Sequence, residues 1–533
     1  MRTSRKAVAV LVVLLVVGLL GTACTSKKAQ APSAPAKPAG VPPDTLVIGV
    51  AEDADNLDPA VTVTNNSWAI TYPCYQRLMR YKVVNGQGST EVEGDLAESW
   101  EVSQDGLVWT FKLKQGFKFD DGTPVDARAV KFTFDRLRKV GKGPFDAFPT
   151  LESVEVVSDY VVRFKLNAPF PPFIYTLANN GASIVNPKVM EHEQGGDQGQ
   201  AYLAEHTMGS GPYRLVEWAK DQYFKLELNP HWPGPKPKFT TVMFKIIKDP
   251  SARRLQLERG DLDIAEELPI DQLEELKKNP DIDVREFPSL SVVYVYLNCK
   301  RKPLDNVKFR QALSYATDYQ GIIKGVMLGK AVQMRGPVPQ GMWGHAPDLF
   351  QYSLDLEKAK QLLAESGVKT PVTLGYLYAD RDPTWEPIGL SLQSTFGQLG
   401  IKVEMQKLAY ATMRDKLDRG DFDLAVGNWS PDFADPYMYM NYWFDSEFFG
   451  LAGNRAFYQN SRVDDLIRRA ARITDQAERE KLYRQAQEII IQEAPYIFLF
   501  QRNYMVAFRK NVKGYVFQPM LVNIFNTADM SKE

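Results

Sequence analysis

Alternating strand-like and helix-like segments in the second half of this chain limit its fold more than any other feature. The strand-like segments are 373–378, 402–408 and 422–426, and the helix-like segments between them are 385–399 and 413–417. This order is typical of a parallel or mixed α/β sheet. Ligands bind to such sheets just beyond the ends of the strands. The sequence therefore predicts an α/β protein whose candidate ligand residues follow those strands.

The loop after the 422–426 strand brings aromatic and acidic residues together. Its sequence over 427–436 is GNWSPDFADP. An indole beside a carboxylate, as in Trp429 and Asp432, can hold an apolar group and a cationic group side by side. The alternative is a core tryptophan and two aspartates in ordinary turns, and a turn role explains Asp435.

Four other residues follow strand-like segments and are candidates for the same ligand site: Asn66, Asn298, Arg381 and Trp385. The alternatives are helix capping for Asn66, a turn for Asn298 and a surface position for Arg381.

Three helices in the first half have recognisable limits. Apolar spacing predicts a helix over 68–78. Asp126 is expected to cap a helix over 127–137, and Gly260 is expected to end a helix over 251–259.

The first residues form a distinct segment. Basic residues at positions 2, 5 and 6 precede an apolar run at 8–20, and Gly-Thr-Ala precedes Cys24. This pattern is typical of a secretory signal peptide, and the run is short for a transmembrane helix. The small residues before Cys24 also resemble a bacterial lipobox, although its leucine lies one position further back than usual. We expect a signal peptide over 1–23 and a lipidated Cys24; the alternative is an ordinary cleaved signal with a free cysteine.

Residues 24–44 are predicted to be the lipidated cysteine and a disordered tether. The segment after Cys24 is rich in proline and alanine and has no aromatic residue, so it cannot build a core. A lipid followed by a tether predicts an extracytoplasmic body anchored to the cell membrane, on the periplasmic side or at the cell surface.

Composition excludes several classes of protein. A chain of 533 residues suggests about three domains. Its 64 Lys and Arg residues nearly balance its 65 Asp and Glu residues, so no basic excess points to nucleic acid. Beyond Cys24 the chain has only Cys74 and Cys299, which make no disulfide framework. We expect two buried thiols, and the sequence leaves open whether they pair.

The motifs of common enzymes are missing from the sequence. It has no Gly-x-Ser-x-Gly, no phosphate-binding loop and no His-Glu-x-x-His, and its four histidines are far apart. We therefore expect no enzyme, no cofactor and no metal site built by the protein.

An ordered set of motifs resembles a known family. The set is Leu96-Ala-Glu-Ser-Trp100, Asp105-Gly106, 117–125, Gly209-Ser-Gly-Pro-Tyr213, Asn229-Pro230, Gly260-Asp-Leu-Asp263 and 306–318. In this order the motifs resemble the family 5 bacterial extracellular solute-binding proteins, the peptide- and nickel-binding components of ABC importers. The resemblance implies an α/β fold, a two-lobed clamshell like that of periplasmic binding proteins. It implies mixed sheets, the large three-domain variant and two hinge crossings between the lobes.

We expect lobe I to be assembled from distant parts of the chain. The expected divisions are 45–85 with 206–295 and 496–533 for the lobe I core, 86–205 for a lobe I subdomain, and 296–495 for lobe II.

The resemblance also implies roles at the ligand site. Peptide-binding relatives use an aspartate three residues after a tryptophan to bind the ligand's α-amino group, and Trp429 and Asp432 keep that spacing. Some oligopeptide-binding relatives have an arginine where this chain has Val426, so another cation must bind a ligand carboxylate. Arg381 is the first candidate and Arg335 the second.

Asp432 is accordingly assigned to the amine and Trp429 to packing against the ligand. Asn66 and Asn298 are assigned to hydrogen bonds with the ligand backbone, and Trp385 to the wall of the site.

The function implied is capture of di- or oligopeptides by lobe closure and delivery to an ABC transporter permease, by a monomer. One alternative is an oligosaccharide stacked on aromatic residues at 385, 429, 437, 439 and 443. A second is a nickel–chelate complex, which needs few protein ligands. A third, of another class, is an exported enzyme or adhesin.

Overall fold

The computed structural model describes residues 41–533. The predicted signal peptide, Cys24 and the tether up to residue 40 lie outside the described residues. The strands are β1 (Thr45–Val50), β2 (Met79–Val84), β3 (Gln87–Gly94), β4 (Ala97–Val102), β5 (Val108–Leu113), β6 (Leu151–Ser158), β7 (Val161–Leu166), β8 (Tyr213–Ala219), β9 (Tyr223–Leu228), β10 (Thr241–Ile246), β11 (Ile264–Ala265), β12 (Ile282–Leu297), β13 (Ala331–Gln333), β14 (Val372–Tyr378), β15 (Ile401–Lys407), β16 (Leu424–Trp429), β17 (Tyr496–Arg509), β18 (Val512–Lys513) and β19 (Ser531–Lys532).

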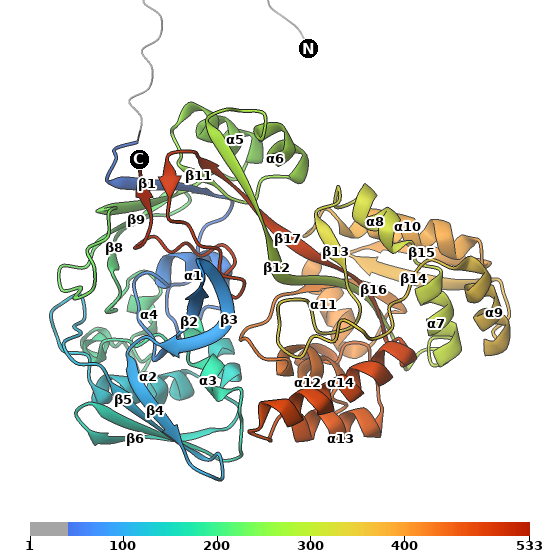
Figure 1. Ribbon diagram of the computed structural model, residues 1–533, viewed down its shortest axis with the longest axis horizontal. Coiled ribbons are helices and arrows are strands. Elements are labelled where there is room, and N and C mark those ends of the chain that lie inside the picture. Colours follow the sequence, from blue (N-terminus) through green and yellow to red (C-terminus); the bar gives the residue numbers. More distant parts are fainter. Residues whose placement is uncertain (1–40) are drawn as a thin grey trace, which may run out of the picture. The chain divides into compact units, whose positions relative to one another are not determined.

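Helices connect and cover these strands (Figure 1). The α-helices are α1 (Asn65–Thr71), α2 (Ala127–Val140), α3 (Phe173–Thr176), α4 (Gln200–Leu203), α5 (Pro250–Arg259), α6 (Ile270–Leu276), α7 (Val307–Tyr315), α8 (Tyr319–Gly325), α9 (Leu356–Ser366), α10 (Trp385–Gly397), α11 (Tyr410–Arg419), α12 (Tyr437–Phe444), α13 (Ser461–Ala470) and α14 (Gln476–Glu493). The short 3-10 helices are η1 (Gly143–Ala147), η2 (Asn180–Ala182), η3 (Pro187–His192) and η4 (Gly450–Ala452). Over residues 41–533, no helix combines the length and the apolar character required to cross a membrane.

The main sheet is mixed, as the sequence predicts. Within the described part of the chain it has 11 strands in the order β15-β14-β16-β12-β17-β11-β1-β10-β9-β8, with β13 beside β17. Strand β14 pairs in parallel with β15 and β16, and β1 pairs in parallel with β10 and β11. Strand β16 is antiparallel to β12, so its carboxyl end delivers Trp429 beside Val292.

Strands β12 and β17 link the two ends of this sheet. They lie side by side and antiparallel along most of their lengths (Figure 1). Their pairing is interrupted between Pro288 and Val292. The Gln501 side chain bridges this interruption, since its amide nitrogen donates to the carbonyl oxygens of Ser289 and Gln340.

A second, antiparallel sheet in the order β4-β5-β7-β6 packs against α2. The Asp126 carboxylate accepts from the backbone N–H groups of Arg128 and Ala129, which confirms the predicted cap. Gly260 adopts φ +84° after α5, which confirms the predicted helix end.

The prediction of a helix over 68–78 is wrong. Helix α1 spans Asn65–Thr71 and is followed by turns, although Tyr75 and Leu78 are buried. The reason is Pro73, which has no N–H for the next hydrogen bond of the helix. The backbone of Tyr72 before it is still helical, with φ −58° and ψ −45°. The apolar residues at helical spacing here do not form one helix face, since Tyr75 packs in the same core cluster as Ile70 and Leu78 packs in another.

The chain termini of the described body lie against each other. Lys532 forms an ion pair with Asp263 at 2.8 Å, and both side chains are 5% exposed. The Lys532 ammonium also donates to the carbonyl oxygens of Pro42 and Thr45. The residues from 41 onward, part of the predicted tether, therefore belong to the folded body.

Candidate functional site

The candidate site is built on the loop that follows β16. Trp429 is the last residue of the strand, Asp432 follows three residues later, and Pro436 precedes α12. The loop is held at both ends, by the β12–β16 pairing and by α12. A rigid loop of this kind fixes the positions of its side chains.

Asp432 presents a carboxylate with no protein partner. Within residues 41–533 its oxygens accept no hydrogen bond and form no ion pair, and the side chain is exposed to solvent. Protein atoms nevertheless surround it closely, and this desolvation, together with the negative charge of Asp146, raises its pKa to about 6. A cationic group of a ligand would offset both the desolvation and the repulsion by Asp146, and would favour the ionised carboxylate.

The residues around Asp432 come from both halves of the chain. Its carbonyl oxygen accepts from the Asn179 side chain at 2.8 Å. The Phe170 ring meets Phe433 at 6.4 Å and Tyr437 at 5.3 Å between centroids. The segment 432–437 is therefore where residues of the predicted lobe I subdomain touch the predicted lobe II.

Trp429 has an aromatic and a cationic neighbour. Its half-buried ring stacks on Tyr442 with centroids 5.1 Å apart. The Arg455 guanidinium lies 5.9 Å from the Trp429 ring centre and is buried. The indole is thus part of an aromatic wall with a positive charge behind it.

Two further cations lie near the carboxyl end of β14. The Arg381 guanidinium packs on the Tyr410 ring at 4.4 Å, and Arg414 lies 5.9 Å from the same ring. Arg381 is exposed and Arg414 half-buried. In the described part of the chain neither forms an ion pair, so both are available to an anionic ligand group.

The structure moves two predicted site residues from the ligand set to the framework. The Asn298 side chain donates to the carbonyl oxygens of Gly420 and Phe422 at 2.9 and 3.0 Å, so its donor is used. Trp385 is 2% exposed and packs inside the sheet–helix layer. Neither can contact a ligand in this conformation.

Two other predicted residues have hydrogen-bond partners within the protein. The Asn66 side chain is in the first turn of α1 and donates to Glu52 at 3.3 Å. Arg335 donates to the carbonyl oxygen of Leu349, outside the loop that carries Trp429.

Asp435 has a structural role larger than the predicted turn. Its carboxylate accepts from the backbone N–H of Tyr437 and pairs with Arg479 at 2.7 Å. The two side chains are 0% and 4% exposed. This buried ion pair ties the loop to α14.

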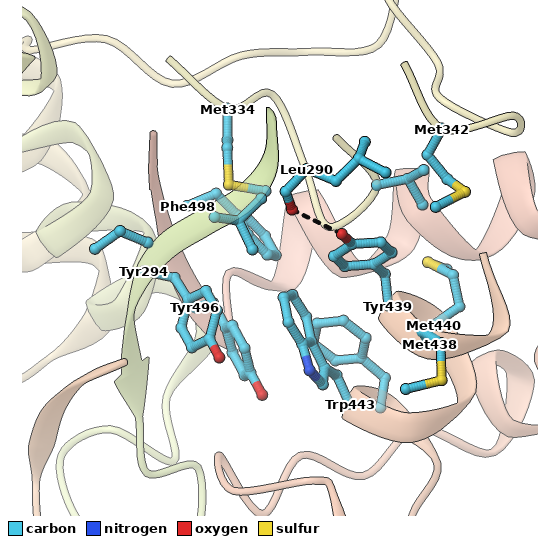
Figure 2. Close-up of a cluster of buried hydrophobic side chains, with 14 of the residues drawn as sticks. Leu290, Tyr294, Met334, Met342, Met438, Tyr439, Met440, Trp443, Tyr496 and Phe498 are labelled. Atoms are coloured by element: carbon cyan, nitrogen blue, oxygen red, sulfur yellow. Dashed lines mark hydrogen bonds between the residues drawn. The ribbon is translucent and has the colours of Figure 1, made fainter. Parts of the chain in front are cut away.

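The aromatic residues proposed for sugar stacking are mostly inaccessible. Tyr439 and Trp443 are 0% exposed and pack on each other, and Trp443 also packs with Tyr294 and Tyr496 (Figure 2). The Tyr439 hydroxyl donates to the Leu290 carbonyl oxygen at 2.9 Å. They form the core beneath the loop.

The thiols and the acidic residues offer no metal site. In residues 41–533, no group of three or more His, Cys, Asp and Glu side chains is placed to hold an ion. Cys74 and Cys299 are both free thiols, and desolvation raises the pKa of Cys299 to about 11. Cys74 is buried as expected, whereas Cys299 is half-buried.

Sequence reasoning missed Asp146, Arg414 and Arg455. Arg455 lies in a polar loop after η4, Arg414 on an exposed-looking helix and Asp146 far away in the chain. No local pattern marks them, because their relation to Trp429 and Asp432 arises only in the folded chain.

Comparison with known proteins gives a consistent result. Residues 91–450 match the model of the bacterial extracellular solute-binding proteins, family 5 (middle region). The chain is 53% identical over 494 residues to the "Probable D,D-dipeptide-binding periplasmic protein DdpA" of Escherichia coli (strain K12), which covers 93% of this chain and 95% of that protein.

Solved structures show the same relation. HbpA2 from Haemophilus parasuis has a TM-score of 0.82 and 30% identity over 92% of this chain and 100% of its own. A second is the ABC transporter-associated periplasmic binding protein DppA from Helicobacter pylori in complex with the peptide STSA. Its TM-score is 0.79 and its identity 28%, over 92% of this chain and 98% of its own.

Fold and site together define a two-lobed, extracytoplasmic solute-binding protein of the periplasmic-binding-protein type. The chain belongs to the bacterial extracellular solute-binding proteins of family 5. The predicted fold class and family are confirmed. The members matched here are solute-binding components rather than enzymes.

Proposed function

We propose that this protein captures short peptides, binds their α-amino group at Asp432 and delivers them to an ABC transporter permease. The observation that carries the proposal is the unpaired Asp432 carboxylate, placed beside Trp429 where residues of both predicted lobes meet. A charge-assisted hydrogen bond to an ammonium group contributes on the order of 1.5–3 kcal/mol.

The unpaired arginines supply the opposite charge. Arg381, with Arg414 on the same Tyr410 ring, is the proposed partner of the peptide's terminal carboxylate. Some oligopeptide-binding relatives have an arginine at the position of Val426. Here Arg381 and Arg414 would supply that positive charge instead. Amine and carboxylate sites of opposite sign suit a zwitterion.

The names of the relatives support a peptide ligand. The 53% identical relative is described as a probable D,D-dipeptide-binding protein, and the Helicobacter pylori structure holds a peptide. We propose a dipeptide or another short peptide, bound by closure of the lobes.

Attachment and partners follow from the same proposal. Cys24 is proposed to be acylated, so that the monomeric body works at the outer side of the cell membrane beside its permease. Mass spectrometry of the membrane-bound protein should detect the acyl groups on Cys24. Cell fractionation is the second test, because Cys24→Ala should release the protein from the membrane fraction.

The central test is calorimetry on the body from residue 41 onward. Ala-Ala in its D,D and L,L forms is compared with N-acetylated and C-amidated versions. We expect N-acetylation and Asp432→Asn each to weaken binding about 10- to 100-fold. Asp305→Asn, an exposed carboxylate on the loop before α7, is the matched control and should bind normally.

The same assay separates the alternatives. C-amidation of the peptide and Arg381→Ala should weaken binding to similar extents. Combined, their effects on the binding free energy should not be additive, because both remove the same contact. Unchanged affinity in Asp432→Asn would overturn the amine assignment. Thermal stabilisation by oligosaccharides or nickel–histidine alone, without any peptide effect, would overturn the peptide proposal.

A further inference from the structure

Arg455 is a buried arginine without a counter-ion. It is 7% exposed, and its side chain makes one hydrogen bond, from Nη1 to the Tyr296 hydroxyl at 3.2 Å. Within residues 41–533 no Asp or Glu pairs with it, and its Nε–H has no acceptor. A buried cation left in this condition is unfavourable unless something else compensates it.

Buried arginines of this chain are compensated in more than one way. Arg136 pairs with Asp58 at 2.6 Å and Arg479 with Asp435 at 2.7 Å. Arg253, also buried, instead donates to four backbone carbonyl oxygens, whereas the one hydrogen-bond partner of the Arg455 side chain is a neutral hydroxyl.

The backbone holds Arg455 firmly in place. The neighbouring Asn454 is fully buried, and its side-chain amide donates to the carbonyl oxygens of Asp445 and Tyr458. The tightly bonded loop after η4 thus fixes where the guanidinium lies.

The residues around Arg455 offer further donors without acceptors. In the described chain, the indole N–H groups of Trp429 and Trp443 and the Tyr496 hydroxyl are buried and unpartnered. Trp429 and Trp443 have centroids 6.5 Å apart, and Trp443 and Tyr496 lie at 5.6 Å. An indole or guanidinium N–H donates only. In Figure 2 the Trp443 nitrogen and the Tyr496 hydroxyl point to the same side.

This combination selects the chemistry of an occupant. A positive charge and N–H donors require a group that only accepts hydrogen bonds and carries negative charge. A carboxylate meets both requirements. The half-buried rings of Trp429 and Tyr442 stack on each other, and the charges of both Arg455 and Asp432 act on Tyr442.

We propose that Arg455, with the indole N–H groups of Trp429 and Trp443, forms an anion site that binds the side-chain carboxylate of an acidic residue in the peptide. This rests on the proposed function, in which Asp432 binds the α-amine and Arg381 the terminal carboxylate. The site makes peptides with an acidic first residue the preferred ligands. Entry requires the Trp429–Tyr442 pair to shift around the ligand side chain.

The test compares Glu-Ala with Gln-Ala, which have nearly the same shape and differ in charge. We expect the unmodified protein to bind Glu-Ala about tenfold or more tightly than Gln-Ala. Arg455→Met should abolish this preference. Arg462→Met, an exposed arginine on α13, is the matched control and should keep the preference.

The unmodified protein alone can contradict the proposal, so poor folding of Arg455→Met does not weaken the test. Equal affinities for Glu-Ala and Gln-Ala overturn the anion site while Ala-Ala binding leaves the proposed function intact. If the unmodified protein binds none of these peptides, both the anion site and the proposed function are overturned. Sodium formate is the second probe: stabilisation by formate that depends on Arg455, without a Glu-Ala preference, assigns the site to a free anion and also overturns the proposal.

Discussion

At Asp432, crowding by protein and the negative charge of Asp146 act in the same direction, because both favour the protonated carboxyl group. The resulting pKa of about 6 leaves a carboxyl group that is about half protonated near pH 6. An ammonium group bound beside it favours the ionised form. Ligand binding and proton release at this residue are therefore linked.

We predict that peptide binding releases about half a proton at pH 6, where Asp432 is half protonated. Near pH 8 binding should instead take up about half a proton, because the free peptide's α-amine, with a pKa of about 8, must be protonated to bind as an ammonium group. Affinity should fall as the pH drops below about 6, because Asp432 must then lose a proton before it can bind the amine. Calorimetry in two buffers with different ionisation enthalpies measures the proton count. The release should vanish in Asp432→Asn; a release that persists would assign the proton to another group.

The Asp435–Arg479 pair leads to a prediction about stability. Asp435→Ala leaves the Arg479 guanidinium buried without its carboxylate, and we expect a loss of about 3–5 kcal/mol in the free energy of unfolding. Urea denaturation provides the measurement. Asp305→Asn, at the surface, should change stability by less than about 0.5 kcal/mol. A small effect of Asp435→Ala would mean that water replaces the carboxylate.

At the scale of elements, β16 and β12 pack so closely that one position between them excludes a side chain. Gly427 lies opposite Tyr294 in the β12–β16 pairing. A Cβ atom there would lie 2.8 Å from ring carbons of both Tyr294 and Tyr296. Tyr296 in turn accepts from Arg455. The glycine thus sets the position of the tyrosines behind Trp429.

We predict that Gly427→Ala lowers the free energy of unfolding by about 1–3 kcal/mol, because the tyrosine rings must shift to relieve the overlap. Thermal and urea denaturation measure the effect. Gly325→Ala, with open space around its Cβ position at the end of α8, is the control and should be neutral or slightly stabilising. Equal behaviour of the two variants would contradict the packing argument.

The sequence supports prediction of most elements and of only part of the site. Alternation over 373–426 predicts β14, β15 and β16, since short apolar strands between amphipathic helices have few other solutions. Trp429 and Asp432 are marked by their position after a strand. Asn298, Trp385 and Arg455 depend on contacts made across the fold, so no local pattern separates their framework roles from ligand roles.

For the whole molecule, the arrangement of β12 and β17 supports a hinge. The pairing of these strands is interrupted between Pro288 and Val292, between the two ends of the main sheet. On the other side of the site, Phe170 and Asn179 touch the segment 432–437. A hinge at this interruption would let the two lobes close and open. The contacts of Phe170 and Asn179 would form on closing and break on opening, as in a two-state motion.

We predict that Phe170→Ala weakens peptide binding about tenfold, because it removes two aromatic contacts worth about 0.5–1.5 kcal/mol each from the closed state. Small-angle scattering should show a larger radius of gyration for the variant at a peptide concentration that compacts the unmodified protein. Phe350→Ala, which is exposed, is the control. An unchanged radius in Phe170→Ala would show that closure does not depend on this contact.

The buried ion pair of Lys532 with Asp263 also affects the order of events in biosynthesis. The same ammonium group holds the backbone at Pro42 and Thr45, so the first strand is secured by a residue made almost 490 positions later. The pairing of β1 with β10 and β11 needs no residue beyond 265, but this buried ion pair can form only once nearly the whole chain has been translated. The order of synthesis thus makes the fastening of β1 by Lys532 one of the last contacts of the folded body to form.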